Sequence, residues 1–144
     1  MLLRRLLLVL LLSLAPGLAG AGEAQWQAFA ARVGLADVEA FVETIGHLDR
    51  TGRLPSRYVT KGEARALGWQ PGRDLWAVAP GRSIGGDIFG NRERRLPPLA
   101  RNAYREADLD YRGGRRNARR LVFGTDGSRW VTMDHYDTFE RVPR

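Results

Sequence analysis

Apolar residues recur at helical spacing in the first half of the chain, whereas in the second half they occur in short runs or alternate with polar residues. After Asp37, a residue suited to cap a helix, apolar positions fall at i, i+3, i+4, i+7 and i+10, as in an amphipathic helix. These positions are Val38, Phe41, Val42, Ile45 and Leu48. Gly52 and Pro55 end the pattern, which therefore predicts a helix between Asp37 and Gly52.

A second, shorter helix is predicted from its cap. Thr60 precedes Glu63 by three residues, which is the spacing of a capping box, and Gly68 ends the segment. Lys61 would then occupy the first helical position. A cation there opposes the helix dipole, so Lys61 is either a tolerated surface residue or part of an anion site.

From Ser83 onward, short apolar segments are separated by glycine, proline and asparagine, which is typical of strands. The central segment, Tyr104–Tyr111, alternates with a period of two. Its apolar face holds Ala107, Leu109 and Tyr111, and its charged face holds Glu106, Asp108 and Asp110. Further strands are predicted over residues 84–89, with a bulge at Gly85–Gly86, and over 121–123, 129–133 and 138–142. Helices followed by an antiparallel sheet predict an α+β fold with the N-terminal helices packed on the sheet.

The N-terminus has the pattern of a secretory signal peptide. Met1–Arg5 is basic, Leu6–Leu14 is apolar apart from one serine, and Ala19–Ala21 offers small residues for cleavage after Ala21. A membrane anchor is the alternative, but the apolar run is shorter than the roughly 20 residues that span a bilayer. We therefore expect a secreted, extracellular protein with no membrane anchor in its mature form.

The rest of the chain is long enough for one domain with a single core. We expect this domain over residues 37–144, after a signal peptide over 1–21 and an N-terminal extension or pro-segment over 22–36. In that middle segment Trp26, Phe29 and Ala30 lie at helical spacing, so it is compatible with a short helix as well. Because the chain has no cysteine, the fold must rest on its core and not on disulfides.

The charge of the chain favours an anionic partner. Its net charge is +7, and without Arg4 and Arg5 it still has 21 basic against 16 acidic residues. Such a balance attracts polyanions such as nucleic acid. Of the 23 basic residues, Lys61 is the one lysine. This departure from an otherwise uniform use of arginine is a weak sign that Lys61 has a specific role.

The charged face of residues 104–111 needs cations, and arginines follow it closely. They flank the Gly113–Gly114 turn and are Arg112, Arg115, Arg116, Arg119 and Arg120. These charges form either a solvated ladder of ion pairs or a site. No histidine-cysteine cluster, phosphate loop or nucleophile elbow is present, so we expect neither a metal nor another cofactor. A glutamate and a histidine can act as general base and general acid, and the surrounding cations favour a phosphodiester substrate.

Several motifs resemble the barnase-type family of bacterial guanyl-preferring secreted ribonucleases, in the same order from about Phe41 to Val142. They are Thr60–Ala64, Leu67–Trp69, Ala79–Phe89, Asn91–Glu93, Arg105–Asp108, Arg116–Asn117 with Arg120, and Asp134–Tyr136 with Thr138–Phe139. The resemblance implies the microbial ribonuclease fold. It also implies metal-independent cleavage of single-stranded RNA on the 3′ side of guanosine, by an endoribonuclease that forms a 2′,3′-cyclic phosphate and then hydrolyses it to a 3′-phosphate.

In this resemblance Glu106 matches the general base that accepts the 2′-hydroxyl proton, and His135 matches the general acid that protonates the leaving 5′-oxygen. The cations that match the phosphate site are Lys61, Arg116 and Arg120. Asp108 matches the residue that orients these arginines, and Asp87 is expected to support the site beside it. The resemblance thereby favours a catalytic role for Lys61.

Guanine preference is implied for the loop Gly90, Asn91, Arg92 and Glu93. Its amides would donate to the 6-oxo group, and Glu93 would accept from the Watson–Crick edge that single-stranded RNA exposes. Phe89 and Tyr136 are expected to line the substrate site. The family also implies a monomer and an acidic protein inhibitor of the barstar type.

Several positions depart from the family pattern, among them Asn102, the hairpin at residues 126–129 and two positions near the expected site. Gly90 stands in place of a serine, which could soften guanine preference, and Arg115 replaces an aromatic residue beside the active-site loop. A non-catalytic RNA-binding module and an antibacterial toxin are the alternatives to a nutritional enzyme. The intact catalytic positions favour an enzyme over a binding module.

Overall fold

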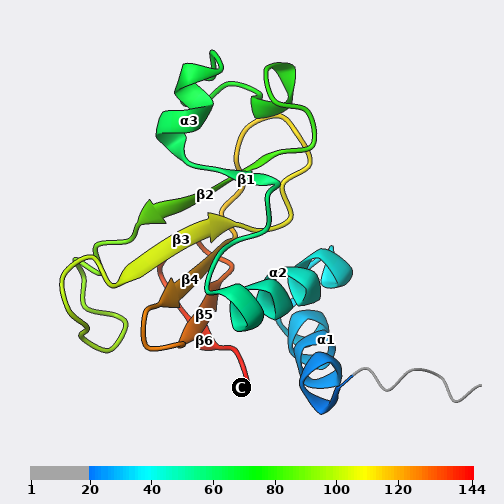
Figure 1. Ribbon diagram of the computed structural model, residues 1–144, viewed down its shortest axis with the longest axis vertical. Helices are drawn as coiled ribbons and strands as arrows, with labels where there is room; N and C mark the ends of the chain where they lie inside the picture. The colour runs from blue at the N-terminus through cyan, green and yellow to red at the C-terminus, as the bar shows by residue number, and fades with distance from the viewer. Residues whose placement is uncertain (1–19) are drawn as a thin grey trace, which may run out of the picture.

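A computed structural model describes residues 20–144, so the predicted signal peptide falls almost entirely outside the described residues. Three α-helices and a 3-10 helix accompany a six-stranded sheet in this part of the chain (Figure 1). The elements are α1 (Ala21–Val33), α2 (Val38–Thr51), β1 (Tyr58–Val59), α3 (Lys61–Ala66), η1 (Leu75–Ala77), β2 (Ser83–Ile88), β3 (Tyr104–Asp108), β4 (Arg120–Gly124), β5 (Arg129–Thr132) and β6 (Glu140–Arg141). None of the helices within residues 20–144 is both long and apolar enough to cross a membrane.

Helix α2 confirms the first helix prediction. The Asp37 carboxylate accepts a hydrogen bond of 3.0 Å from the amide of Ala40, and Gly52 ends the helix in the left-handed conformation, with φ of 69°. Phe41, Ile45 and Leu48 are buried against the sheet, so the apolar stripe faces the core as its spacing predicted.

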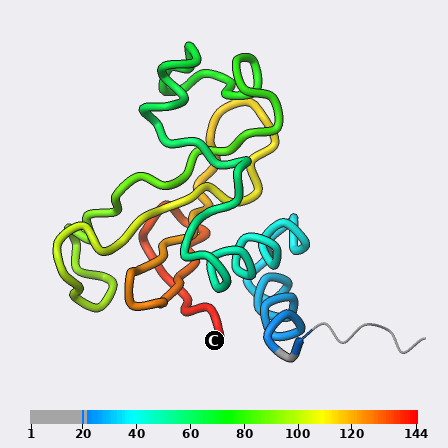
Figure 2. The backbone as a smooth tube through the Cα atoms, viewed as in Figure 1, coloured from blue at the N-terminus to red at the C-terminus, as the bar shows by residue number. Residues whose placement is uncertain are grey.

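Helix α1 belongs to the same core as α2. Its Trp26, Phe29 and Ala30 are buried, and the rings of Phe29 and Phe41 stack with centroids 5.9 Å apart. The indole of Trp26 donates a hydrogen bond of 2.9 Å to the carbonyl of Pro143, so the chain ends beside α1 (Figure 2). The segment 22–36, placed before the domain from sequence, therefore contributes large side chains to the core of that domain.

The sheet has the order β1-β2-β3-β4-β5-β6, with all neighbours antiparallel except β1 and β2. The predicted bulge is present where the register between β2 and β3 shifts from Gly85 to Asp87. A Cβ atom at Gly85 would lie 2.5 Å from Cδ1 of Tyr58, so the close approach of these strands requires glycine. N-terminal helices packed on this sheet confirm the α+β fold.

The two faces of the sheet pack against different hydrophobic clusters. Ala107, Leu121 and Val131 point to the core under α2, whereas Tyr104 and Val122 join a smaller cluster on the opposite face. A third cluster packs α3 and η1 over the ends of β1 and β2; it contains Val59, Ala64, Trp69, Leu75, Ala79, Ile84 and Tyr111. Figure 1 shows α3 at the opposite end of the molecule from α1. The third cluster fixes the position of α3 and thus of Lys61.

The alternation predicted for residues 104–111 holds to Asp108 and fails at Asp110. Asp110 has a φ of 56°, which turns its side chain toward α2. Its carboxylate there accepts hydrogen bonds of 2.8 and 2.9 Å from the amides of Ala36 and Asp37, and it pairs with Arg119. Two carboxylates, not three, therefore remain on the charged face.

Candidate active site

Glu106 occupies the middle of β3, on the face turned away from α2. Only 9% of the residue is exposed. The phenol of Tyr136 donates a hydrogen bond of 2.7 Å to Oε2 of Glu106, and the ammonium of Lys61 lies 3.7 Å from Oε1. Burial and this hydrogen bond raise the pKa of Tyr136 well above its ordinary value. Tyr136 is therefore a hydrogen-bond donor throughout the neutral pH range, and each oxygen of Glu106 has a partner.

Asp108 follows on the same face and binds two arginines. It accepts two hydrogen bonds of 2.7 Å from Nε and Nη2 of Arg116, and Nε of Arg120 lies 3.1 Å from Oδ1. The exposed fractions of the Asp108 and Arg120 side chains are 1% and 3%. Burial alone would lower the pKa of Arg116, but the hydrogen bond and charge of Asp108 outweigh it and the pKa is raised. These ion pairs are thus buried and not a solvated ladder.

Lys61 begins α3, as the capping box predicted. The Thr60 hydroxyl accepts a hydrogen bond from the amide of Glu63, and the amide of Thr60 donates one to the Glu63 carboxylate. The Asp87 carboxylate in β2 accepts a hydrogen bond of 2.9 Å from the amide of Lys61. Because α3 has only six residues, its dipole is small, and the ammonium group is the main positive charge that α3 brings to Glu106.

His135 lies on a turn after β5 whose backbone is unusual. His135 and Tyr136 have φ of 53° and 72°, a conformation that costs free energy in residues other than glycine. Asp134 supports the turn: it accepts 2.9 Å hydrogen bonds from the Thr132 hydroxyl and the Thr138 amide, and one of 2.6 Å from the Thr138 hydroxyl. The amide of His135 donates to the carbonyl of Ala118, which ties the turn to the loop of Arg116.

The predicted base-binding loop lines a groove of about 920 Å³ that also contains Glu106 and Tyr136. Asn91 supports the loop from inside, since its side chain donates to the carbonyl of Leu96 at 2.9 Å and accepts from the amide of Leu96 at 3.1 Å. Gly90, Arg92 and Glu93 are exposed on this loop. Phe89 stacks on Tyr136 with centroids 5.3 Å apart, so the floor of the groove joins the loop to the His135 turn.

This arrangement can move protons beside a phosphate. A buried carboxylate and three cations lie on one face of the central strands β3 and β4, and the exposed imidazole of His135 lies against the ring of Tyr136, which reaches the same carboxylate. Within residues 20–144, no three histidine, cysteine, aspartate or glutamate residues are grouped so that they could hold a metal ion. The side chains that could act on a substrate here are therefore acids, bases and cations.

Known proteins are similar in sequence to most of this chain. A family model described as ribonuclease matches residues 43–143. A ribonuclease from Bacillus intermedius is 49% identical over 109 residues, which make up 75% of this chain and 67% of that protein. A ribonuclease from Heyndrickxia coagulans is 48% identical over 106 residues, or 73% of this chain and 97% of that protein. The chain belongs to the ribonuclease family.

This finding confirms the family that the motifs indicated. The ribonuclease also resembles guanyl-specific ribonuclease St from Saccharopolyspora erythraea, with 42% identity over 55 residues, which are 38% of this chain and 54% of that protein. A crystal structure of ribonuclease Sa2 with exo-2′,3′-cyclophosphorothioate is 23% identical, with a TM-score of 0.46, over 78% of this chain and 91% of that one.

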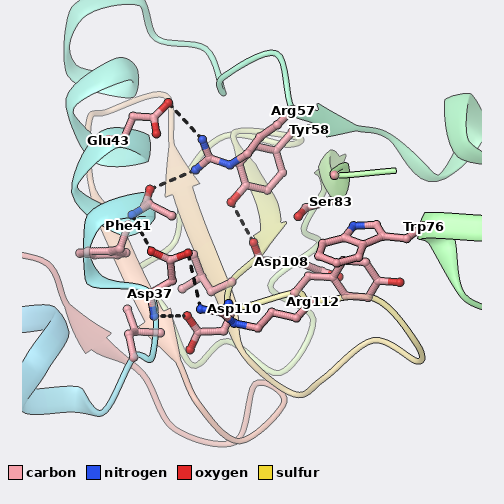
Figure 3. Close-up of a pocket in the computed structure, with 15 residues that line it drawn as sticks. Asp37, Phe41, Glu43, Arg57, Tyr58, Trp76, Ser83, Asp108, Asp110 and Arg112 are labelled. Atoms are coloured by element: carbon pink, nitrogen blue, oxygen red, sulfur yellow. Dashed lines mark hydrogen bonds and ion pairs between the residues drawn. The ribbon is translucent and has the colours of Figure 1, made fainter. Parts of the chain in front are cut away.

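The ribonuclease has a separate cavity of about 290 Å³ on the α2 side of the sheet (Figure 3). Several of its polar groups pair with one another. Arg57 lies 3.2 Å from Glu43, and the phenol of Tyr58 donates a hydrogen bond of 2.9 Å to the carbonyl of Asp108. Asp110 likewise accepts from the amide of Asp37. These contacts hold α2 and the residue before it against β1 and the end of β3.

Sequence reasoning missed three residues that support the site of the ribonuclease. Asp134 holds the His135 turn, and its position between Thr132 and Thr138 was the available signal. Asn117 donates to the carbonyl of Leu109 and accepts from the amide of Arg119, which shapes the arginine loop. Arg95 pairs with Glu93 and with Asp137. No local pattern indicates that last contact, because its partners lie about 40 residues apart in the chain.

Proposed function

We propose that the protein cleaves single-stranded RNA on the 3′ side of guanosine by transphosphorylation. The observation that supports this most is the buried Glu106 carboxylate, which lies beside Lys61 and in the same groove as the base-binding loop. Glu106 accepts the proton of the ribose 2′-hydroxyl as that oxygen bonds to phosphorus. The bond from phosphorus to the 5′-oxygen breaks, and His135 gives its proton to that oxygen. The product is a 2′,3′-cyclic phosphate.

In the second step the roles reverse. His135 accepts a proton from water as the water oxygen bonds to phosphorus. The bond from phosphorus to the 2′-oxygen breaks, and Glu106 returns its proton to that oxygen. The result is a 3′-phosphate, and both side chains regain their starting states. General acid and base groups of this kind are typically worth about 10²–10⁴-fold in rate.

The charges around Glu106 suit this reaction. The site has three positive charges, on Lys61, Arg116 and Arg120. It has two negative charges, on Glu106 and Asp108. When Glu106 takes up the proton, the local charge becomes more positive by one unit as negative charge accumulates on the phosphorane. The site therefore attracts the transition state more strongly than the substrate.

Guanine preference is proposed for residues 90–93. Glu93 can accept from the donors of the guanine Watson–Crick edge, and Asn91 holds the loop so that its amides can reach the 6-oxo group. Similarity to a guanyl-specific relative supports this assignment. Gly90 does not have a positive φ, so the serine of the family could be accommodated there and the loop does not require glycine for its conformation.

We also propose that the protein is exported and acts as a metal-independent monomer. Its leader has the basic, apolar and small-residue regions of a signal peptide. Residues 22–36 would remain as an extension, since α1 supplies Trp26 and Phe29 to the core. A cationic groove of this kind also fits an acidic protein inhibitor of the barstar type, whose association would be fast and sensitive to salt.

The proposal is tested by incubating the purified protein with a mixed-sequence RNA and mapping the new 3′ ends. We expect ends after guanosine that carry a cyclic phosphate first and a 3′-phosphate later, at the same rate with and without EDTA. Glu106→Gln serves as the control for contaminating nucleases. Ends with a 3′-hydroxyl, or a rate that depends on added metal, would contradict the mechanism, and ends without guanosine would contradict the base preference.

A further inference from the structure

One arginine connects the base-binding loop to the turn that carries His135. Nε of Arg95 donates a hydrogen bond of 2.9 Å to Oε2 of Glu93, within the loop. Nη2 of the same guanidinium lies 3.4 Å from Oδ1 of Asp137, two residues after His135. Arg95 therefore touches the carboxylate proposed to recognise guanine and, at the same time, a carboxylate of the catalytic turn.

Without Arg95 these two carboxylates would repel each other. Both lie within 3.4 Å of one guanidinium, so the two carboxylates are close to each other. Like charges at such separations repel each other, and these two belong to different segments, so without Arg95 their repulsion would favour a larger distance between the loop and the turn. Because the Arg95 guanidinium contacts both carboxylates, the loop and the turn attract each other through it.

The other end of each segment is already fixed. The ring of Phe89 stacks on that of Tyr136 with centroids 5.3 Å apart, and Asp134 holds the turn through Thr138. Asn91 closes the loop through Leu96. At Glu93, where the loop would meet the base, Arg95 joins the loop to the turn through its ion pair with Asp137. Arg95 thus adds a second attachment between the loop and the turn at the edge where the base would enter.

We propose that Arg95 is a positioning residue that holds the guanine-binding loop at a fixed distance from the His135 turn. This proposal rests on the proposed function, because it assigns base recognition to Glu93 and proton donation to His135. Arg95 acts through Glu93 and Asp137 and touches no reacting atom. Since the ion pair is exposed, its effect is modest, about two- to fivefold, and is weakened by salt.

The test compares Arg95→Gln, Asp137→Asn and their double variant with Arg94→Gln. Arg94→Gln removes the same charge from the same loop, and among residues 20–144 Arg94 forms no ion pair, which makes it the matched control. The readout is the ratio of kcat/KM for guanylyl-3′,5′-adenosine to that for adenylyl-3′,5′-adenosine. It is measured at about 20 mM and about 500 mM salt, roughly sevenfold below and threefold above physiological ionic strength.

Arg95→Gln and Asp137→Asn should each lower this ratio about two- to fivefold at low salt, and less at high salt. The double variant should lose no more than either single variant, and Arg94→Gln should keep the wild-type ratio. Asp137→Asn is decisive, because removal of a negative charge would strengthen binding of an anionic substrate if general attraction alone were at work. An unchanged or raised ratio in that variant overturns the positioning role.

Amide hydrogen exchange separates this proposal from the proposed function. Arg95→Gln and Asp137→Asn should each speed exchange of the amides of Leu96 and Thr138, which donate to Asn91 and Asp134, whereas Arg94→Gln should not. A wild-type enzyme without guanine preference would contradict the proposed function while exchange still tests the attachment. A wild-type enzyme with guanine preference whose exchange is unaffected by these variants would contradict the role of Arg95 alone.

Discussion

The phenol of Tyr136 donates to the same Glu106 carboxylate that Lys61 approaches from the other side. The two contacts use different oxygens, so the carboxylate is held in one orientation by a neutral donor and a cation. Oxygen Oε1, which faces only the 3.7 Å approach of Lys61, is the freer of the two to accept a proton. This relationship leads to the first prediction.

Tyr136→Phe should lower kcat/KM about tenfold, because a hydrogen bond to a charged group is worth roughly 1.5–3 kcal/mol and part of it acts only in positioning. The ring is kept, so its stacking on Phe89 and the fold should be preserved. Tyr111→Phe removes another phenol, one that donates to the carbonyl of Gly114, and is the control. Steady-state rates on a guanosine dinucleotide measure the effect. Equal losses in both variants would show that general loosening, not the contact to Glu106, is responsible.

Asp134 gives a prediction on pH. Hydrogen bonds from the side chain and amide of Thr138 lower the pKa of Asp134 to about 2, from an ordinary value of 3.8. The folded state therefore binds this proton less readily than the unfolded state, so the stabilisation is complete above about pH 4 and is lost as the pH falls through about 2. The melting temperature of wild type should exceed that of Asp134→Asn at pH 5, and the gap should close near pH 2. Asp137→Asn is the control in the same turn; a gap that is constant with pH would contradict this account.

Lys61→Arg should reduce turnover about tenfold or more without a change in stability. The ammonium is a compact charge on a flexible stem, whereas the wider guanidinium fork would need a different approach to Glu106 and to phosphate. Arg65→Lys makes the reverse exchange at an exposed position of the same helix and should be silent. If Lys61→Arg is as active as wild type, the single lysine of the chain has no special role.

His135 and Glu106 should respond differently to the leaving group. An aryl phosphate of guanosine departs as a stable phenolate that needs no proton, so His135→Ala should recover much of its loss on this substrate. Glu106→Ala should not recover, because the 2′-hydroxyl must be activated whatever leaves. The losses on a dinucleotide should lie near 10²–10⁴-fold, large enough to resolve. Equal rescue of the two variants, or rescue of neither, would contradict the assignment of His135 as general acid and Glu106 as general base.

Trp26→Ala should destabilise the protein by roughly 3–5 kcal/mol, the usual cost of truncating a large buried aromatic residue. Trp26 is 7% exposed and its indole reaches the carbonyl of Pro143, so the variant loses packing and a hydrogen bond together. Urea unfolding measures the change, and Gln27→Ala, at the exposed neighbouring position, is the control. The active site is remote, so the folded fraction should keep its kcat. A small effect would mean that α1 is dispensable for the core.

The sequence predicted features that are determined by neighbouring residues in the chain. It missed features that depend on contacts between residues far apart in the chain. Helix α2 follows from its apolar stripe and Asp37 cap, and the bulge follows from Gly85–Gly86. Asp110 was misplaced because a period of two assumes extended backbone, and its φ of 56° breaks that assumption. The contacts that fix Asp110 come from Ala36 and Asp37, more than 70 residues earlier in the chain.

The same division applies to the site. Alternation alone placed Glu106 and Asp108 on one face of β3, and the capping box placed Lys61 at the start of α3. The alternation does not indicate which of the five following arginines binds Asp108, because Arg116 lies in a loop shaped by Asn117; only the family resemblance indicated Arg116 and Arg120, and the structure places both against Asp108. That loop also receives the amide of His135 at Ala118, so its conformation depends on a segment that comes later in the chain.

The positive φ of His135 also affects how this enzyme would respond to selection. The residue is exposed and its backbone is held in a conformation that glycine adopts at little cost. Among variants recovered by heat resistance alone, His135→Gly would be favoured by relief of strain while the proposed proton donor is lost. Stabilising this protein by laboratory evolution therefore requires a simultaneous screen for RNA cleavage, because the proposed general acid occupies a position where thermal stability and activity select different residues.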